Sequence, residues 1–503
     1  MKFFILSLFV FLLYNYSFTQ PITNHNAIPQ TNLSQPQRYV PYNDPMFNST
    51  VVRISNALAD NIEGTFPDYS KRQAWNSNES LMMLRSGNGD VLIYNGTTYQ
   101  YIKTLPSSLT GVQDIFWHPA NPLLINFTMD NYFNVIDEQS LNVTTLHTFS
   151  NYAYISTRAE GNMSNNGRYI AMCGYDVNWN PIDFFVYDVM LDAVISTLNV
   201  SATVSSFDWI SISPLGNFVV VDYADETVGP FHGVEVYDQQ FNVIWQKPIG
   251  YGHSDLGLDS NGIEVLIMDK YDGDSNLTYI NKYNLADTNQ ISLLSISPEF
   301  DLHESCRSMS RPGWVYVSTF DYVGRLTDDS ASWLPFEDEV FALKMDGSGS
   351  VQRFAHHHSR RFSPTTPNSG NSVYFAEPHA TANRTGTKIL FGSNWRLNMQ
   401  SDTSVDAYIC DVSALITSSE NFSVENNNEI NIYPNPSSDG LFKFQSSSFK
   451  IKNVVITDIT GRVIITLYNT QGILNLSDVK SGIYFLNSND GKNVLNKKLQ
   501  VIK

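Results

Sequence analysis

The sequence predicts an all-β protein: a seven-bladed β-propeller, within a range of six to eight blades, followed by a small C-terminal β-sandwich. Three observations predict it. A turn-and-strand unit recurs about every 50 residues, helical periodicity is nearly absent, and the last 70 or so residues are short strands between turn signals. We divide the chain into residues 1–20 (signal peptide), 21–46 (N-terminal lead-in), 47–412 (propeller), 413–431 (linker) and 432–503 (C-terminal domain).

Composition restricts the class of partner. The 503 residues carry a formal net charge of -18, from 49 acidic and 31 basic side chains. Such a surface repels phosphate backbones, so nucleic acid is not expected as a partner. Cys173, Cys306 and Cys410 allow at most one disulfide, whose pairing stays open. Stability must therefore come from a hydrophobic core.

The first 20 residues are typical of a secretory signal peptide. Lys2 is followed by about a dozen apolar residues, and polar side chains then follow at once. This run is shorter than the ~20 residues that a membrane-spanning helix needs, although an uncleaved anchor is the alternative. No later segment has 18 consecutive apolar residues, so we expect no transmembrane segment in the mature chain.

Glycines mark the repeat of the central region. Those at positions 167, 216, 262 and 313 lie about 46 to 51 residues apart, and the longer step to Gly386 can hold one insertion. Each precedes a strand, and about 20 residues later a second strand ends in an aromatic residue and Asp or Asn. Some 365 residues divided by this period give about seven propeller blades, with the ring closed by pairing of the first and last blades. An array of β-sandwiches or a right-handed β-helix is the alternative.

Six of the ten histidines fall between His253 and His379. They occur in four stretches at similar points of successive units: 252–255, 303–307, 355–359 and 377–379. Because equivalent positions of successive blades converge on one face or on the channel mouth, we expect these side chains to lie close together. Imidazoles and carboxylates that converge can bind a divalent metal or take a proton from a carbon acid. Histidines at the start of propeller strands can also be purely structural, and this alternative stays open.

The histidine stretches, together with the Arg311–Trp314 and Gly386–Trp395 segments, resemble the oligogalacturonate lyase family. This resemblance implies a seven-bladed propeller that binds a divalent metal, Mn or Ca. The metal ligands that it implies are His303, His356 and His358, with Gln352 as the amide ligand in a plausible place. The catalytic residues that it implies are His253, as base or ligand, and Arg307 or Arg311, as partner for a uronate carboxylate. Within the three consecutive histidines, the alternating pair 356 and 358 can face the same way on a strand.

Two functions follow from these residues. The first is a propeller that binds glycan or protein at the cell exterior; the alternative is a metal-assisted lyase that acts on an acidic, uronate-containing polysaccharide. Tryptophans are candidate platforms for sugar stacking, although propeller cores use the same residue. These are Trp117, Trp179, Trp209, Trp314, Trp333 and Trp395.

After the polar linker, turn signals separate short alternating strands, which predicts an antiparallel β-sandwich. Three motifs follow one another in it: Tyr433-Pro434-Asn435-Pro436, then Asp458-x-x-Gly461-Arg462, then Gly482-Ile483-Tyr484. They resemble the type A C-terminal sorting domain of the Bacteroidetes type IX secretion system. The resemblance implies transport by that machinery across the outer membrane, removal of the domain, and release or attachment at the cell surface. An accessory ligand-binding sandwich is the alternative.

Overall fold

The computed structural model describes residues 20–250, 252–321, 333–361, 374–395, 405–416, 430–435, 437–446, 453–458, 463–468, 473–489 and 494–502. The predicted signal peptide lies outside the described residues except for Gln20, and so do Pro436, Gly461 and Arg462 of the C-terminal motifs. The chain forms two compact units, a large one that contains most of residues 20–416 and a small C-terminal one.

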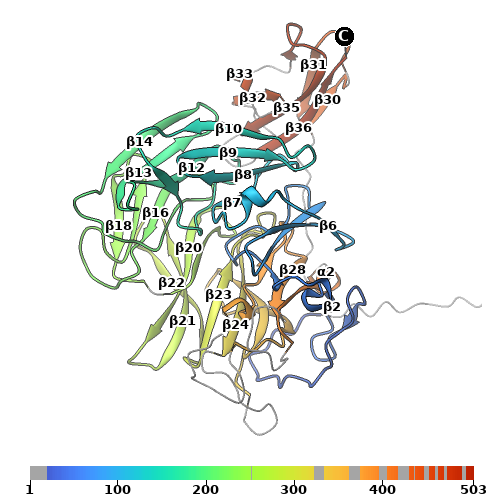
Figure 1. Cartoon of the computed structure of the whole chain (residues 1–503), viewed down its shortest axis with the longest axis vertical. Helices are drawn as coiled ribbons and strands as arrows, with labels where there is room; N and C mark the ends of the chain where they lie inside the picture. Colours follow the sequence, from blue (N-terminus) through green and yellow to red (C-terminus); the bar gives the residue numbers. More distant parts are fainter. Residues whose placement is uncertain are drawn as a thin grey trace, which may run out of the picture. The chain divides into compact units, whose positions relative to one another are not determined.

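The large unit contains seven antiparallel sheets in sequence order around a ring (Figure 1). Six of them have four strands, and the first strand of each is the inner one. Blade 1 holds β3 (Thr65–Phe66), β4 (Leu81–Ser86), β5 (Val91–Asn95) and β6 (Tyr101–Thr104), and blade 2 holds β7 (Ile115–Trp117), β8 (Leu124–Met129), β9 (Tyr132–Asp137) and β10 (Val143–Thr148). Blade 3 holds β11 (Tyr154–Ser156), β12 (Tyr169–Tyr175), β13 (Pro181–Asp188) and β14 (Ala193–Asn199), and blade 4 holds β15 (Trp209–Ile212), β16 (Phe218–Asp222), β17 (Val234–Asp238) and β18 (Val243–Lys247). Blade 5 holds β19 (Ser254–Leu258), β20 (Glu264–Asp272), β21 (Leu277–Asn284) and β22 (Gln290–Ile296), and blade 6 holds β23 (Phe300–Ser305), β24 (Trp314–Asp321), β25 (Glu339–Lys344) and β26 (Val351–His356).

The seventh blade closes the ring. It contains β27 (Thr381–Ala382), β28 (Lys388–Ser393) and β29 (Asp406–Asp411) from the end of the repeat, and β1 (Tyr42–Asn43) and β2 (Thr50–Arg53) from its beginning. Strand β2 pairs antiparallel with β29, Thr50 opposite Asp411 and Arg53 opposite Tyr408. Strand β29 lies between β2 and β28 in this sheet, and Figure 1 shows the blue β2 and the orange β28 in the same part of the ring. The predicted seven-bladed propeller is confirmed, and its closing strand comes from ahead of the first blade.

The repeating glycines have a structural reason. Gly167, Gly216, Gly262, Gly313 and Gly386 lie in the turn between the first and second strands of their blades, with φ between 70° and 86°. Side chains other than hydrogen are disfavoured there. At Gly386 an added Cβ would also come within 2.3 Å of the Tyr316 hydroxyl of the neighbouring blade. The period seen in the sequence is therefore the period of this turn.

Apolar side chains fill the space between neighbouring blades. Strands such as β16 are buried on both faces, which is why the apolar runs do not alternate. The lead-in runs along blades 6 and 7, where the Trp395 indole donates to the Leu33 carbonyl. There the buried Arg353 also donates to the carbonyls of Asn24 and Asn26. All three cysteines are buried and free.

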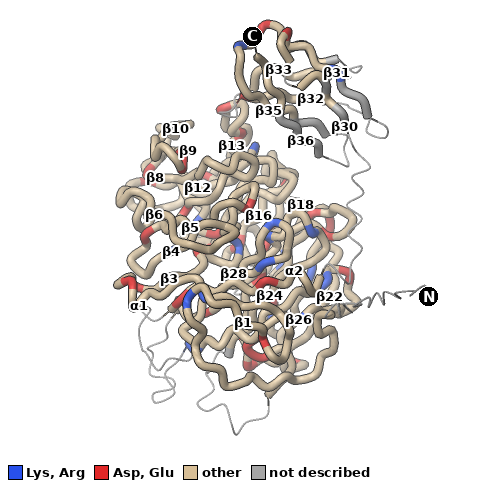
Figure 2. The backbone as a smooth tube through the Cα atoms, turned by 90° about the vertical axis from the view of Figure 1, so that its right-hand side faces the viewer, with Lys and Arg blue, Asp and Glu red and all other residues tan. Residues whose placement is uncertain are grey.

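Short helices complete the large unit: α1 (Ala57–Asp60), α2 (Ser413–Ile416), and the 3₁₀ turns η1 (Ser107–Leu109) and η2 (Tyr374–Ala376). No helix among the described residues is long and apolar enough to cross a membrane. Acidic and basic positions are interspersed along the propeller backbone (Figure 2), so the negative charge is not confined to one stretch of it.

The C-terminal unit has two small antiparallel sheets. One contains β30 (Ile430–Tyr433), β31 (Leu441–Ser446) and β34 (Ile473–Asn475), and the other contains β33 (Val463–Tyr468), β32 (Asn453–Asp458), β35 (Gly482–Asn489) and β36 (Val494–Val501). Residues of both sheets, among them Phe442, Ile456 and Leu486, share one apolar core. Two motif residues stabilise it: the Tyr484 hydroxyl donates to the Lys480 carbonyl, and Asn435 Oδ1 accepts from the Gln500 N–H.

Candidate metal centre

Three consecutive blades bring histidines together at the end of the ring where their inner strands begin. His253 directly precedes β19 of blade 5, His303 lies on β23 of blade 6, and His379 lies two residues before β27 of blade 7. The ring centroids of His253 and His303 are 4.3 Å apart, and those of His303 and His379 are 4.2 Å apart. The expected convergence of equivalent blade positions therefore applies to these three side chains.

Glu377 completes a group of three ligands with His303 and His379. Its Oε2 atom lies 3.6 Å from Nε2 of His303 and 3.6 Å from Nε2 of His379. The exposed fractions of the three residues are 0% for His303, 3% for Glu377 and 2% for His379. His379 is held with a φ of 41° in the left-handed region, a strain that is concentrated at functional sites.

The protonation of the group suits metal binding. Burial, with the positive charges around it, holds the pKa of His303 well below its usual range. Burial likewise lowers the pKa of His379 to about 3. Both rings are therefore neutral at pH 7, and a neutral imidazole is the form that ligates a metal. Burial raises the pKa of Glu377 to about 7, against the opposing charge of Arg361.

Unsatisfied polar atoms show that a divalent ion fits this place. Both ring nitrogens of His303 and Nε2 of His379 are buried without a hydrogen-bond partner. Buried polar atoms are rarely left so. Two ligand atoms about 2.1 Å from one ion at a tetrahedral angle are about 3.4 Å apart, close to the separations found here. Two histidines and one carboxylate are a ligand set for Zn, Mn and Fe.

His253 is oriented by a carboxylate beside the centre. Its Nδ1 lies 3.2 Å from Oδ1 of Asp301, and both side chains are partly exposed, at 27% and 29%. The His253 N–H of the backbone is held by Asp269. Burial alone lowers the pKa of the His253 ring, but the hydrogen bond and charge of Asp301 outweigh it and raise the pKa to about 9.

Partly exposed side chains surround the buried ligands. Nε of Arg361 lies 2.8 Å from Oε1 of Glu377, on the side away from the histidines. The ring of Tyr374, nearly half exposed, lies 5.0 Å from that of His379. The ring of Tyr69 lies 5.5 Å from His303 and 5.2 Å from His379. Charged and hydroxyl groups are thus available next to the ligands for a bound molecule.

Tyr69 reaches the centre on a segment, residues 67–73, that lies across the middle of the ring. Arg72 of this segment donates to Asp114 of blade 2 and to the carbonyls of Ala159 and Gly161 of blade 3. The Lys71 ammonium lies 4.3 Å over Trp209 of blade 4. Gln73 donates to the Arg307 carbonyl after β23 and to the Ala382 carbonyl on β27. A blade-1 segment that touches blades 2, 3, 4, 6 and 7 must occupy the channel.

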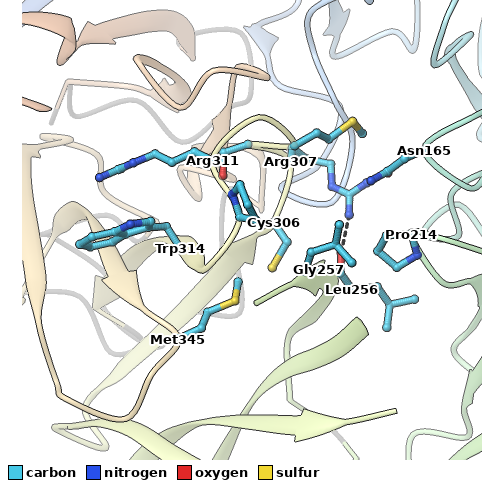
Figure 3. A pocket seen from close by; sticks show the side chains of 13 residues that line it. Asn165, Pro214, Leu256, Gly257, Cys306, Arg307, Arg311, Trp314 and Met345 are labelled. Atoms are coloured by element: carbon cyan, nitrogen blue, oxygen red, sulfur yellow. Dashed lines mark hydrogen bonds between the residues drawn. The ribbon is translucent and has the colours of Figure 1, made fainter. Parts of the chain in front are cut away.

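The two arginines expected to be catalytic lie after β23, where the inner strand ends. Arg307 donates from Nε and Nη2 to the Asp255 carboxylate and from Nη2 to the Leu256 carbonyl. Arg311 donates to the Tyr316 hydroxyl and to Oε1 of Gln352. Figure 3 shows the two guanidinium groups extending in opposite directions beside a shallow pocket that also contains Cys306. Their catalytic role, like the metal role of Gln352, stays a prediction.

The three consecutive histidines lie at the end of the outer strand of blade 6, with His356 its last residue. The ring of His356 packs 5.0 Å from Phe47 and 5.6 Å from Trp333. His358 stacks 4.2 Å from Trp395, and His357 lies 2.8 Å from the Thr319 carbonyl oxygen. The group of three ligands found among the described residues does not include them. Their role as metal ligands stays a prediction.

Sequence reasoning singled out the 377–379 stretch without assigning it a role. Both Glu377 and His379 precede a very short inner strand, β27, which has only two residues. No apolar run marks that strand, so its position relative to the histidine is hard to recognise. The signal available was the glycine turn at Gly386, which places an inner strand just ahead of it.

Comparison with known proteins identifies the C-terminal unit and the propeller fold. Residues 431–503 match the family described as the secretion system C-terminal sorting domain. The propeller resembles an oligogalacturonate lyase from Vibrio parahaemolyticus with a TM-score of 0.52 at 12% identity, over 74% of this chain and 96% of that one. An oligogalacturonate lyase in complex with manganese gives a TM-score of 0.51 at 12% identity, over 78% and 98%. No curated protein sequence matches the chain. At such identity the likeness shows the fold.

Proposed function

Residues 431–503 are a secretion sorting domain, which sends the chain across the outer membrane to the surface or exterior, and from this premise we propose that the propeller is an extracellular, metal-dependent lyase of acidic polysaccharide. His303, Glu377 and His379 hold the metal in this proposal. The observation that carries it is their convergence: three buried ligand atoms lie within 4.8 Å of one another. Both ring nitrogens of His303 and Nε2 of His379 have no hydrogen-bond partner. The manganese complex of a lyase with the same fold supports it.

A divalent ion at this place would neutralise the carboxylate of a uronate and acidify the proton on the adjacent carbon. His253, in its neutral form, is the base that takes that proton; a pKa of about 9 makes this the minor form at pH 7. Since Asp301 lies against Nδ1, Nε2 is the atom that faces the reaction, and the same carboxylate stabilises the imidazolium that forms. A cation next to His253 disfavours its protonated form, which offsets part of the effect of Asp301 on its pKa.

Tyr69 and Arg361 complete the reaction. As the proton leaves, its electron pair forms a carbon–carbon double bond, and the bond from the next carbon to the glycosidic oxygen breaks. The departing oxygen needs a proton, and burial keeps Tyr69 a neutral phenol that can donate one, because it raises the pKa of Tyr69 far above the usual range. Arg361 is positioned to pair with a substrate carboxylate.

The test uses the mature chain, without its signal peptide, purified and analysed for bound metal. Polygalacturonate, alginate and a glucuronan are each incubated with the protein, and formation of the unsaturated product is followed by ultraviolet absorbance. We expect product from at least one substrate, its loss on chelation, its recovery with Mn²⁺, and its loss in Glu377→Gln and His253→Gln. Metal binding without unsaturated product from any polyuronate would refute the lyase.

A non-catalytic glycan-binding propeller is the second candidate function. The near-complete burial of the three ligands favours it, because a structural metal is typically closed off from solvent. In that case metal removal lowers the unfolding temperature, and Glu377→Gln binds the polysaccharide as weakly as the chelated wild type does. His253→Gln then leaves binding unchanged, which separates the two functions.

A further inference from the structure

One tryptophan of the propeller is displayed to solvent. Seven of the eight tryptophans are buried or half-buried among the blades, whereas the Trp179 side chain is 53% exposed. Sequence alone could not separate a tryptophan that stacks on sugars from one that fills a core. The structure makes this separation, and it selects Trp179.

A rigid turn presents this indole. Trp179 lies between β12 and β13 with a φ of 62°, a strained value for a large side chain. Oδ1 of Asp176 accepts the backbone N–H groups of Asn178 and Asn180, and Oδ2 accepts from the Asn180 amide. The Trp179 N–H itself donates to the Asp176 carbonyl. The turn therefore holds Trp179 in a strained backbone conformation although its ring is exposed, so burial of the ring does not offset the strain.

A second aromatic ring supports the first. Tyr154, at the start of β11, stacks on Trp179 with a centroid distance of 4.2 Å and an angle of 7° between the rings. Tyr175 lies 5.3 Å away at 50° and packs against the edge. Since Tyr154 covers one face of the indole, the exposed surface includes the other face. We call Trp179 and Tyr154 the aromatic platform.

We propose that the aromatic platform binds a neutral pyranose unit of a polysaccharide. The C–H groups on one face of a pyranose are weakly positive, and they pack on the negative face of an aromatic ring, while the hydroxyl groups at the sugar's edge stay in water. The Asp176 carboxylate, in the same turn as Trp179, adds negative charge beside the platform. The guanidinium of Arg158 packs over Phe207, whose ring lies 6.4 Å from that of Tyr175. A uronate carboxylate would be repelled there, so an uncharged sugar fits better.

The platform lies on the same face of the ring as the metal centre. Tyr154 opposes Tyr175 in the β11–β12 pair, so the turn that follows β12 lies beside the start of the inner strand of blade 3. His253 and His379 lie just ahead of the inner strands of blades 5 and 7. One polysaccharide could therefore touch both places. The platform has no metal ligand, so this proposal does not depend on the proposed lyase.

The test is affinity gel electrophoresis of the mature chain in gels that contain xyloglucan, mixed-linkage β-glucan or galactomannan, with polygalacturonate as the charged comparison. We expect at least one neutral polysaccharide to retard the wild type, with or without chelator, and Trp179→Ala to weaken that binding at least tenfold. Trp179→Phe should keep part of it. Tyr271→Ala is the matched control and should bind as the wild type does, because Tyr271, near the end of β20 before the corresponding turn of blade 5, is equally exposed.

A folding defect can be told apart from a binding defect. Trp179→Gly suits the positive φ, so its unfolding temperature should equal or exceed that of the wild type while its binding is lost. Equal retardation of the wild type and Trp179→Gly would overturn the proposal, and so would retardation by polygalacturonate alone. An absence of retardation in all three neutral gels would overturn it as well.

Discussion

Mn²⁺ should raise the unfolding temperature of the propeller, because it binds the native state through His303, Glu377 and His379. A ligand at a hundred times its dissociation constant stabilises the native state by about 2.7 kcal/mol. The propeller has about 375 residues between β1 and α2, and unfolding entropy is about 2.1 cal/mol/K per residue, so its total is about 0.8 kcal/mol/K. The expected shift is therefore about 3 °C.

Differential scanning calorimetry of the mature chain, with and without Mn²⁺ after chelation, resolves a shift of that size. Glu377→Gln and His379→Gln should abolish the Mn²⁺-dependent shift, whatever their metal-free unfolding temperatures are. The matched control is His356→Gln. This histidine is as buried as the ligands but packs against Phe47, so the variant should keep the full shift.

Three results would refute this reasoning. A shift that persists in both Glu377→Gln and His379→Gln would show that the ion binds elsewhere. Loss of the shift in His356→Gln would instead support the ligand set implied by the sequence resemblance. Absence of any shift in the wild type at millimolar Mn²⁺, or with Zn²⁺ in its place, would remove the metal centre altogether.

Three further predictions concern stability, measured by urea unfolding of the mature chain. Burial raises the pKa of Asp222 to about 7, so the native state keeps a proton that the unfolded chain has lost. The free energy of unfolding therefore falls as pH rises from about 4 to 7, by up to about 1.4 kcal/mol per unit. Asp222→Asn should gain stability relative to the wild type over the same pH range, and a pH-independent difference would contradict this. Arg72→Met removes a buried ion pair with Asp114 and should lower the free energy of unfolding by about 3–5 kcal/mol. A decrease below about 1 kcal/mol would show that the propeller does not need the channel segment for its stability. Val51→Asp puts a charge at a fully buried position of the closing strand and should lower the free energy of unfolding by at least about 3 kcal/mol, with early proteolysis of residues 20–53. Resistance to proteolysis equal to that of the wild type would disprove closure by β2.

The blades could be predicted from the sequence because the same local turn recurs in successive blades. A turn that needs a positive φ requires glycine, and the same turn opens the second strand of successive blades, so Gly167, Gly216, Gly262 and Gly313 record the period directly. The buried second strands add apolar runs at the same spacing. Both signals are local in the sequence, and neither depends on which strands finally pair.

Ring closure could not be located in the same way. Strand β2 has only four residues, and its partner β29 lies some 360 residues later in the chain. No local pattern specifies such a pair, because the pairing is decided by which edge remains unpaired once the other blades have formed. The lead-in is equally non-local, since Ile22 bridges to Arg353.

The site was partly predictable for a related reason. His253 and His303 lie at or just before clear inner strands, so the rule that equivalent positions converge placed them together. His356 and His358 satisfy the spacing rule for a shared strand face, but His356 ends the outer strand of their blade and His358 lies beyond it. Glu377 and His379 precede an inner strand of two residues that carries no hydrophobic signature. Residue type thus identified the chemistry, while position within the blade decided which residues meet.

The pairing of charges in the channel bears on how an acidic chain could recognise an acidic sugar. Lys71 pairs with Glu160, Arg72 with Asp114, Arg307 with Asp255 and Arg361 with Glu377. Each of these basic side chains is therefore matched by a carboxylate, and little positive charge remains for a uronate in a protein with a net charge of -18.

A divalent ion on His303, Glu377 and His379 would add two positive charges to a group that supplies only one negative charge. An ion held there would compete with Arg361 for the charge of the Glu377 carboxylate, which would make that guanidinium more available to a substrate carboxylate. The metal and the arginine should accordingly act together, and Arg361→Gln should weaken polyuronate binding more in the presence of Mn²⁺ than after chelation.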